Sequence, residues 1–182
     1  KLLVPDGSGR AMVARVVDHL LDSPARPVLV VLGHRADEVR AALAGRPVQF
    51  VMAPDFADGL SASLRAGIAA VPPGADGALV CLGDMPLVTG GMMARLIEAY
   101  DPTECRSIVA PTCRTKVGNP VLWDRRFFPE IAGLSGDMGA RPLLERHAEH
   151  VAYVELDDDA VLRDFDTVES LAGLGAPAPT GV

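Results

Sequence analysis

A carboxylate follows an apolar run near the middle of the chain. Residues 78–82 read Ala-Leu-Val-Cys-Leu, and the next four are Gly-Asp-Met-Pro. The run is typical of a buried parallel strand, and Pro86 prevents the strand from continuing, so Asp84 is expected at a strand end. Ligands bind at that edge of open α/β sheets, where a carboxylate can hold a metal ion against a phosphorylated substrate. The alternative is that Asp84 caps a helix beginning near Thr89.

A second candidate contact for a substrate is the segment 59–63, Gly-Leu-Ser-Ala-Ser. It precedes a run with helical spacing, so its amides and hydroxyls would form a helix N-terminus that favours anions. The alternative is a capping segment with no other role.

Secondary-structure elements must position these residues. The spacing of the apolar residues predicts alternating strands and helices. Strands are expected at residues 28–32, 48–52, 78–82, 107–110, 121–123 and 151–156, and helices at 12–21, 36–43, 60–71, 92–100, 126–131, 140–147 and 167–174. Alternation of this kind predicts a parallel sheet with helices on both faces. After residue 111 the alternation breaks, and 121–123 is a candidate antiparallel strand. A single domain over residues 1–174 and a disordered tail at 175–182 are expected.

Composition limits the classes of partner. The 182 residues are 49% apolar, enough for one buried core. The net charge of −7 and the lack of Lys/Arg clusters argue against nucleic acid, although a metal ion could still bring in a phosphorylated small molecule. No apolar run has the length of a membrane span, and no signal peptide is recognisable. Three cysteines without a CxxC pair fit a reducing cytoplasm and argue against a zinc site.

Six short motifs occur in order along the chain. They are KLLVP at 1–5, GLSASLRAG at 59–67, GDMP at 83–86, GNPVL at 118–122, GDMGAR at 136–141 and DFDT at 164–167. With them the chain resembles the MobA-like nucleotidyltransferases, and within these the molybdenum cofactor cytidylyltransferases, from residue 1 to about residue 174.

The resemblance implies a three-layer αβα sandwich, the Rossmann-like nucleotide-diphospho-sugar transferase fold with a mostly parallel sheet. It implies nucleotide transfer with Mg²⁺ and release of pyrophosphate. Lys1 matches the family's triphosphate lysine, Asp84 its metal aspartate and Asp166 its second metal carboxylate. From the residues alone, an N-cap before Thr167 is the favoured alternative for Asp166. The family's first strand and Gly-rich loop would lie before Lys1, so we expect upstream residues to supply them.

The resemblance also implies two substrate sites. The nucleotide-binding residues would be Lys1, Gly33, His34, Gly59, Ser61, Ser63, Gly83 and Asp84. The acceptor-binding residues would be Gly118, Asn119, Pro120, Asp137 and Arg141. The guanidinium of Arg141 suits a phosphate, and its alternative is an ion pair with Glu145. The alternative for His34 is a solvated loop histidine.

The expected function is therefore transfer of CMP from CTP to the phosphate of molybdopterin, in a protein that serves a molybdenum hydroxylase. Two alternatives stay open. One is a GTP-using guanylyltransferase acting on the molybdenum cofactor or on phospholactate, since relatives set base choice largely through the loop before the lysine. The other is a non-catalytic carrier of the molybdenum cofactor.

Overall fold

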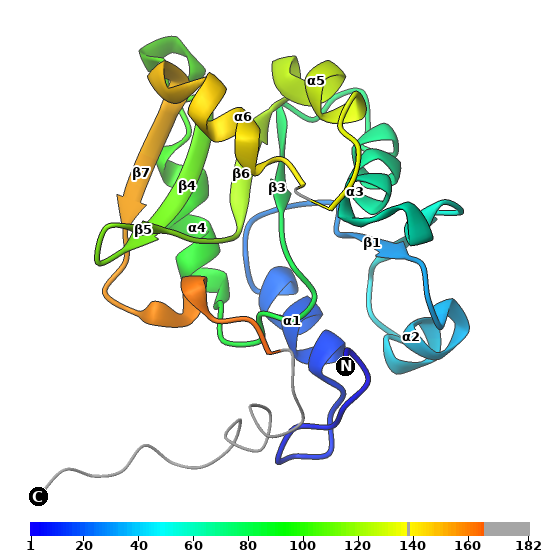
Figure 1. The fold of residues 1–182 in the computed structure, drawn as a ribbon. Coiled ribbons are helices and arrows are strands. Elements are labelled where there is room, and N and C mark those ends of the chain that lie inside the picture. Colours follow the sequence, from blue (N-terminus) through cyan, green and yellow to red (C-terminus); the bar gives the residue numbers. More distant parts are fainter. Residues whose placement is uncertain (138, 166–182) are drawn as a thin grey trace, which may run out of the picture.

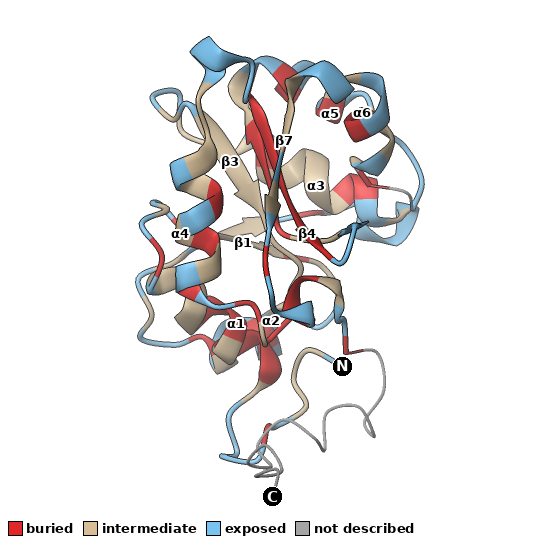
Figure 2. Ribbon diagram, turned by 90° about the vertical axis from the view of Figure 1, so that its left-hand side faces the viewer, coloured by how far each residue is buried: buried red, intermediate tan, exposed pale blue. Residues whose placement is uncertain are grey.

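The computed structural model describes residues 1–137 and 139–165, and its strands lie between two layers of helices (Figure 1). Figure 2 shows α1 (Met12–Leu21) and α4 (Gly90–Ala99) on one side of the strands. On the other side lie α3 (Leu60–Ala69), α5 (Phe128–Ala132) and α6 (Arg141–Arg146). The predicted α/β class, with helices on both faces, is confirmed.

The strands form a mixed arrangement. β1 (Leu29–Leu32) pairs with β2 (Gln49–Met52) in parallel. In a second sheet, β3 (Gly77–Val80) and β4 (Ile108–Cys113) both pair antiparallel with β6 (Val121–Asp124), which lies between them. β4 also pairs with β5 (Lys116–Val117) in antiparallel and with β7 (Val151–Glu155) in parallel. β3, β4 and β7 therefore run in one direction, and the segment predicted as an antiparallel partner is β6.

The reversal at β6 has a local cause. Only Arg114 and Thr115 separate β4 from β5, and both have positive φ, 49° and 69°. Two residues with positive φ make the tight turn that joins antiparallel strands, whereas a parallel connection needs a crossover of a dozen residues or more. The chain therefore returns beside β4 and not over a face of the sheet.

The core occupies both faces of the second sheet. On the α3, α5 and α6 face, Trp123 packs with Ile108 and Leu143. On the α4 face, Val109 and Leu122 pack with Leu96. Successive residues of β4 thus point to opposite faces and are all buried, as expected of a central strand.

The predicted elements agree closely with those observed. α1 has the predicted ends, α2 spans Ala36–Ala42, and the other predicted elements agree to within a few residues, whereas β5 was not predicted. Short 3₁₀ helices lie at Phe56–Asp58, Pro102–Glu104, Arg125–Phe127, Ala148–His150 and Asp159–Leu162. The predicted helix at 167–174 and the predicted tail lie outside the described residues. Within residues 1–137 and 139–165, no helix has the length and apolar character to cross a membrane.

Candidate functional site

Asp84 lies just beyond the carboxyl end of β3, beside the start of the chain. Lys1 Nζ donates to Asp84 Oδ2 over 2.6 Å, and the two side chains are 40% and 16% exposed. Leu2 packs against Gly83, where a Cβ would come within 3.3 Å of Leu2 Cδ2. From the far end of the described chain, the amide of Phe165 donates to the Asp84 carbonyl over 3.0 Å. Two segments distant in sequence therefore meet at the loop that carries Asp84.

The capping alternative for Asp84 is not what the structure shows. The N-cap of α4 is Thr89, whose Oγ1 accepts from the amide of Met92 over 3.3 Å. Asp84 Oδ1 is buried and has no hydrogen-bond partner among the described residues. Among the described residues, the carboxylate is thus held through one oxygen, by a lysine.

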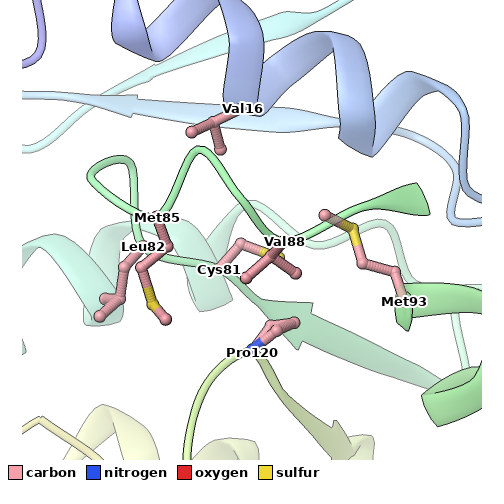
Figure 3. A pocket seen from close by; sticks show the side chains of 7 residues that line it. All are labelled: Val16, Cys81, Leu82, Met85, Val88, Met93 and Pro120. Carbon is pink, nitrogen blue, oxygen red and sulfur yellow. The ribbon is translucent and has the colours of Figure 1, made fainter. Parts of the chain in front are cut away.

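The loop behind Asp84 rests on apolar side chains, shown in Figure 3. They come from α1, α4, the residues on either side of Asp84 and the residue before β6, and are Val16, Cys81, Leu82, Met85, Val88, Met93 and Pro120. The void between them is about 10 Å³, room for one water at most. Burial raises the pKa of Cys81 to about 12, so its sulfur is a neutral thiol that packs and does not react. Tight packing here fixes the backbone that presents Asp84.

The segment that carries Lys1 is joined to α1 through the backbone. The amide of Met12 donates to the carbonyl of Val4, and the amide of Val13 donates to that of Leu2, each over 3.0 Å. These bonds occupy donors that a helix N-terminus otherwise leaves unpaired. Lys1 therefore extends from a backbone that is tied to the helix.

The N-terminus of α3 is capped by residues 136–137. The amide of Leu60 donates to Asp137 Oδ1 over 3.3 Å, and the amide of Ser61 donates to the carbonyl of Gly136 over 3.1 Å. Ser61 is fully buried, and its hydroxyl has no partner among residues 1–137 and 139–165. Gly59, at a φ of 104°, packs against Gly136. The segment therefore receives its cap from residues 136–137 and supplies no side-chain cap of its own, and nucleotide contact through Gly59 and Ser61 stays a prediction.

A larger cavity, of about 230 Å³, opens beside α3. Its walls are mainly apolar and come from α3, β3, β5, β6, α6 and neighbouring loops. They are formed by Leu60, Leu64, Val80, Leu82, Val117, Gly118, Asn119, Val121, Trp123, Gly139, Ala140, Arg141 and Leu144. Besides the indole of Trp123, the side chains of this lining that carry hydrogen-bonding groups are Asn119 and Arg141. Three of the five predicted acceptor residues therefore line one cavity.

The wall at Gly118 has a fixed shape. A Cβ there would come within 2.1 Å of the Val161 carbonyl oxygen, so the two backbones touch. The amide of Asn119 donates to the same oxygen over 2.9 Å, which holds the Asn119 backbone beside the cavity. Among the described residues, Arg141 and Glu145 form no ion pair within 4.0 Å, so the alternative for Arg141 is not observed.

The remaining predicted residues lie apart from this cavity. Pro120 is buried under the Asp84 loop, and Asp137 is engaged at α3. Gly33 packs against Phe56, where a Cβ would come within 2.7 Å of the phenylalanine Cβ. His34 is exposed, with its ring 6.4 Å from that of Phe56. Ser63 is half-buried in the first turn of α3. Sequence reasoning passed over Phe56 and the wall residue Trp123, because an aromatic residue alone does not signal a site.

The donor set at Asp84 suits a hard cation. Mg²⁺ binds through one or two carboxylates together with substrate phosphates, and Asp84 offers a buried oxygen with no partner in the described chain. Residues 1–137 and 139–165 contain no cluster of three His, Cys, Asp or Glu side chains that could hold a metal. The second predicted ligand, Asp166, lies outside the described residues.

Comparison with known proteins identifies relatives along most of the chain. Nicotine blue oxidoreductase of Paenarthrobacter nicotinovorans is 29% identical over 168 residues, which cover 90% of this chain and 82% of that protein. The manganese complex of Rv0371c from Mycobacterium tuberculosis H37Rv has a TM-score of 0.80 at 28% identity, covering 93% of this chain and 88% of the other.

A nucleotidyl transferase from Methanothermobacter thermautotroptrophicus has a TM-score of 0.78 at 26% identity, covering 93% of this chain and 81% of the other. These similarities confirm the nucleotide-diphospho-sugar transferase fold that the motifs predicted. The family model of the MobA-like NTP transferase domain matches residues 1–151. The chain belongs to the MobA-like NTP transferase domain family.

Proposed function

We propose that this nucleotidyltransferase transfers CMP from CTP to the phosphate of molybdopterin and releases pyrophosphate. The observation that carries the proposal is the contact between Lys1 Nζ and Asp84 Oδ2 at the end of β3, 2.6 Å long. A lysine and a carboxylate side by side offer one group for a triphosphate and one for the cation that accompanies it. On nucleotide binding, the Lys1 ammonium would exchange the carboxylate for phosphate oxygens.

The chemistry needs no side-chain nucleophile. A phosphate oxygen of the acceptor forms a bond to the α-phosphorus of CTP, and the bond from that phosphorus to the bridging oxygen of the β-phosphate breaks. The bridging oxygen and its electron pair leave with pyrophosphate. Lys1 would stabilise the charge that grows on the leaving group, and Asp84 and Asp166 would hold Mg²⁺. When bound, Mg²⁺ supplies neutralisation of phosphate charge.

Charge supports a divalent cation as part of the donor site. The chain carries a formal charge of −7, which by itself disfavours a triphosphate. A divalent cation on the nucleotide offsets part of that repulsion. The related Rv0371c structure was determined as a complex with manganese, a cation that shares the preference of Mg²⁺ for oxygen ligands.

The cavity beside α3 supports a planar acceptor with one anionic group. Its mainly apolar walls, Trp123 among them, suit a ring system, and Arg141 offers a fork of donors for one phosphate. In this arrangement Asn119 would hydrogen-bond the ring or the phosphate. GTP in place of CTP, with the same acceptor or with phospholactate, is the alternative.

Substitution of the two polar wall residues tests the acceptor site. We expect Arg141→Ala and Asn119→Ala, in the full-length protein, to lower efficiency with molybdopterin by about 10- to 100-fold and to leave CTP affinity unchanged. The cause is loss of a hydrogen bond to the acceptor alone. Steady-state kinetics with varied acceptor, and calorimetric titration of CTP and GTP with Mg²⁺, give the two quantities.

The matched control is Arg146→Ala. Arg146 also lies in α6, but it pairs with Glu130 over 3.1 Å and does not line the cavity, so both quantities should keep their wild-type values. If the wall variants weaken CTP binding and leave use of the acceptor unchanged, the cavity belongs to the nucleotide and molybdopterin loses its support. A clear preference for GTP in the titration would replace CTP as the donor.

A further inference from the structure

A buried carboxylate lies in the loop that leads from Lys1 to α1. The side chain of Asp6 is only 3% exposed, unusual for an acid in a loop. Its Oδ1 accepts from the amide and hydroxyl of Ser8, over 2.9 and 2.5 Å, and from the amide of Arg10 over 3.1 Å. Its Oδ2 lies 3.7 Å from Arg10 Nε and 3.7 Å from Arg15 Nη1. The carboxylate is thus surrounded by donors from the loop and from α1.

These bonds close a turn. The amide of Asp6 donates to the carbonyl of Arg10 over 2.8 Å, the amide of Gly9 donates to that of Asp6 over 2.9 Å, and Pro5 and Ala11 form an isolated bridge. The Asp6 side chain adds its bonds inside the same turn. One arm of the turn continues into α1, and the other, residues 1–5, ends at Lys1 beside Asp84.

We propose that Asp6 is a positioning residue for Lys1, because its carboxylate closes the 6–10 turn and so holds residues 1–5 against α1 with the lysine at Asp84. The inference rests on the proposed role of Lys1 in nucleotide binding. The contacts of Asp6 are made with Ser8, Arg10 and Arg15, and Asp6 is absent from the lining of the cavity beside α3. These partners lie in the 6–10 turn and in α1, so the route that we infer from Asp6 to the nucleotide is the loop that carries Lys1.

The charge of Asp6 is stable over the pH range of an assay. Hydrogen bonding from the Ser8 hydroxyl, aided by the two amides and Arg10, lowers the pKa of Asp6 to about 2. Because the folded-state pKa lies below the ordinary value of 3.8, the stabilisation is present above about pH 4 and is lost as the pH falls toward 2. Asp6 therefore holds the turn at all pH values used for nucleotide binding.

A double-mutant cycle separates positioning from a general structural role. The measured quantity is the Kd of Mg²⁺–CTP, by calorimetry, for the full-length wild type, Lys1→Ala, Asp6→Asn and the double variant. We expect Lys1→Ala to weaken binding about 10- to 100-fold and Asp6→Asn about 3- to 10-fold. In the Lys1→Ala background, Asp6→Asn should add nothing, because both changes remove the same contact.

The control is Asp101→Asn. Asp101 lies in another turn and has donors of the same kind: it accepts from the amide and hydroxyl of Thr103 over 3.1 and 2.6 Å, and it pairs with Arg106 over 3.0 Å. Its replacement should leave the Kd unchanged. Ser8→Ala removes one donor to Asp6 while keeping the carboxylate, and it should give a smaller loss with the same non-additivity. If thermal unfolding shows that Asp6→Asn does not fold, Ser8→Ala tests the positioning role in its place.

The two proposals fail in different ways. If Lys1→Ala binds Mg²⁺–CTP as well as the wild type, the role of Lys1 is wrong and the positioning role fails with it. If Lys1→Ala weakens binding but Asp6→Asn and Ser8→Ala do not, or their losses add fully to that of Lys1→Ala, the positioning role alone is overturned.

Discussion

Replacement of Asp84 by asparagine is expected to lower nucleotide transfer by roughly 100- to 1000-fold, the loss found when one electrostatic contact to a developing charge is removed. The fold should persist, because within residues 1–137 and 139–165 this carboxylate is hydrogen-bonded by the part-exposed Lys1 alone. Such a pair contributes on the order of 1 kcal/mol or less to stability. Pyrophosphate release and thermal unfolding of the full-length variant and wild type give both quantities.

A carboxylate elsewhere provides the control for Asp84. Asp101 accepts from the amides of Thr103 and Glu104 and pairs with Arg106 over 3.0 Å, at a turn that lines neither cavity. Asp101→Asn should keep wild-type turnover. Turnover retained in Asp84→Asn would remove the metal role, and loss of the fold would show that Asp84 is structural.

Trp123→Ala should have the largest effect on stability, about 3–5 kcal/mol of the free energy of unfolding. The side chain is 2% exposed and packs edge-on against Phe127, with ring centroids 6.2 Å apart. Removing it leaves a large cavity among Ile108, Ile131 and Leu143, where the sheet meets the layer of α3, α5 and α6. The free energy of unfolding is measured by urea unfolding followed by circular dichroism. Tryptophan fluorescence does not serve here, because the chain has one tryptophan and the variant lacks it.

Trp123→Phe is the companion variant. It keeps an aromatic ring in the cluster and should cost clearly less than the alanine change. Because Trp123 also lines the cavity beside α3, the phenylalanine variant, if folded, should weaken acceptor use more than CTP binding. A loss below about 1 kcal/mol for Trp123→Ala would mean that this cluster does not hold the layer of α3, α5 and α6 against the sheet.

Much of the fold follows from local patterns in the sequence. In α1 the buried residues Met12, Val13, Val16 and Val17 lie on one face, and that spacing alone predicts the helix. The run into Asp84 predicts a strand end because apolar residues stop abruptly at Gly and Pro. The reversal after β4 was only partly predictable, since Arg114 and Thr115 adopt positive φ without being glycine or asparagine.

The site was less predictable, because its contacts join distant segments. Lys1 and Asp84 are 83 residues apart, and only the family resemblance indicated that they meet. Asp137, which caps α3, lies 77 residues from Leu60 in the sequence. The residues around Leu60 do not reveal this partner, so the local pattern indicated an N-terminus with free amides. Asp6 gave no signal of its own, because an Asp-Gly pair in a loop ordinarily suggests a turn and not a buried carboxylate.

The central claim is that Asp84 holds a divalent cation that accompanies the nucleotide, with Lys1 beside it. Electron paramagnetic resonance of Mn²⁺, titrated with full-length protein in the presence and absence of CTP, measures this without knowledge of the acceptor. We expect wild type to bind Mn²⁺ tightly only when CTP is present, and Asp84→Asn to lose that binding by at least about tenfold. Nucleotide that binds equally well in chelator, or Mn²⁺–CTP binding that survives Asp84→Asn, would contradict the claim.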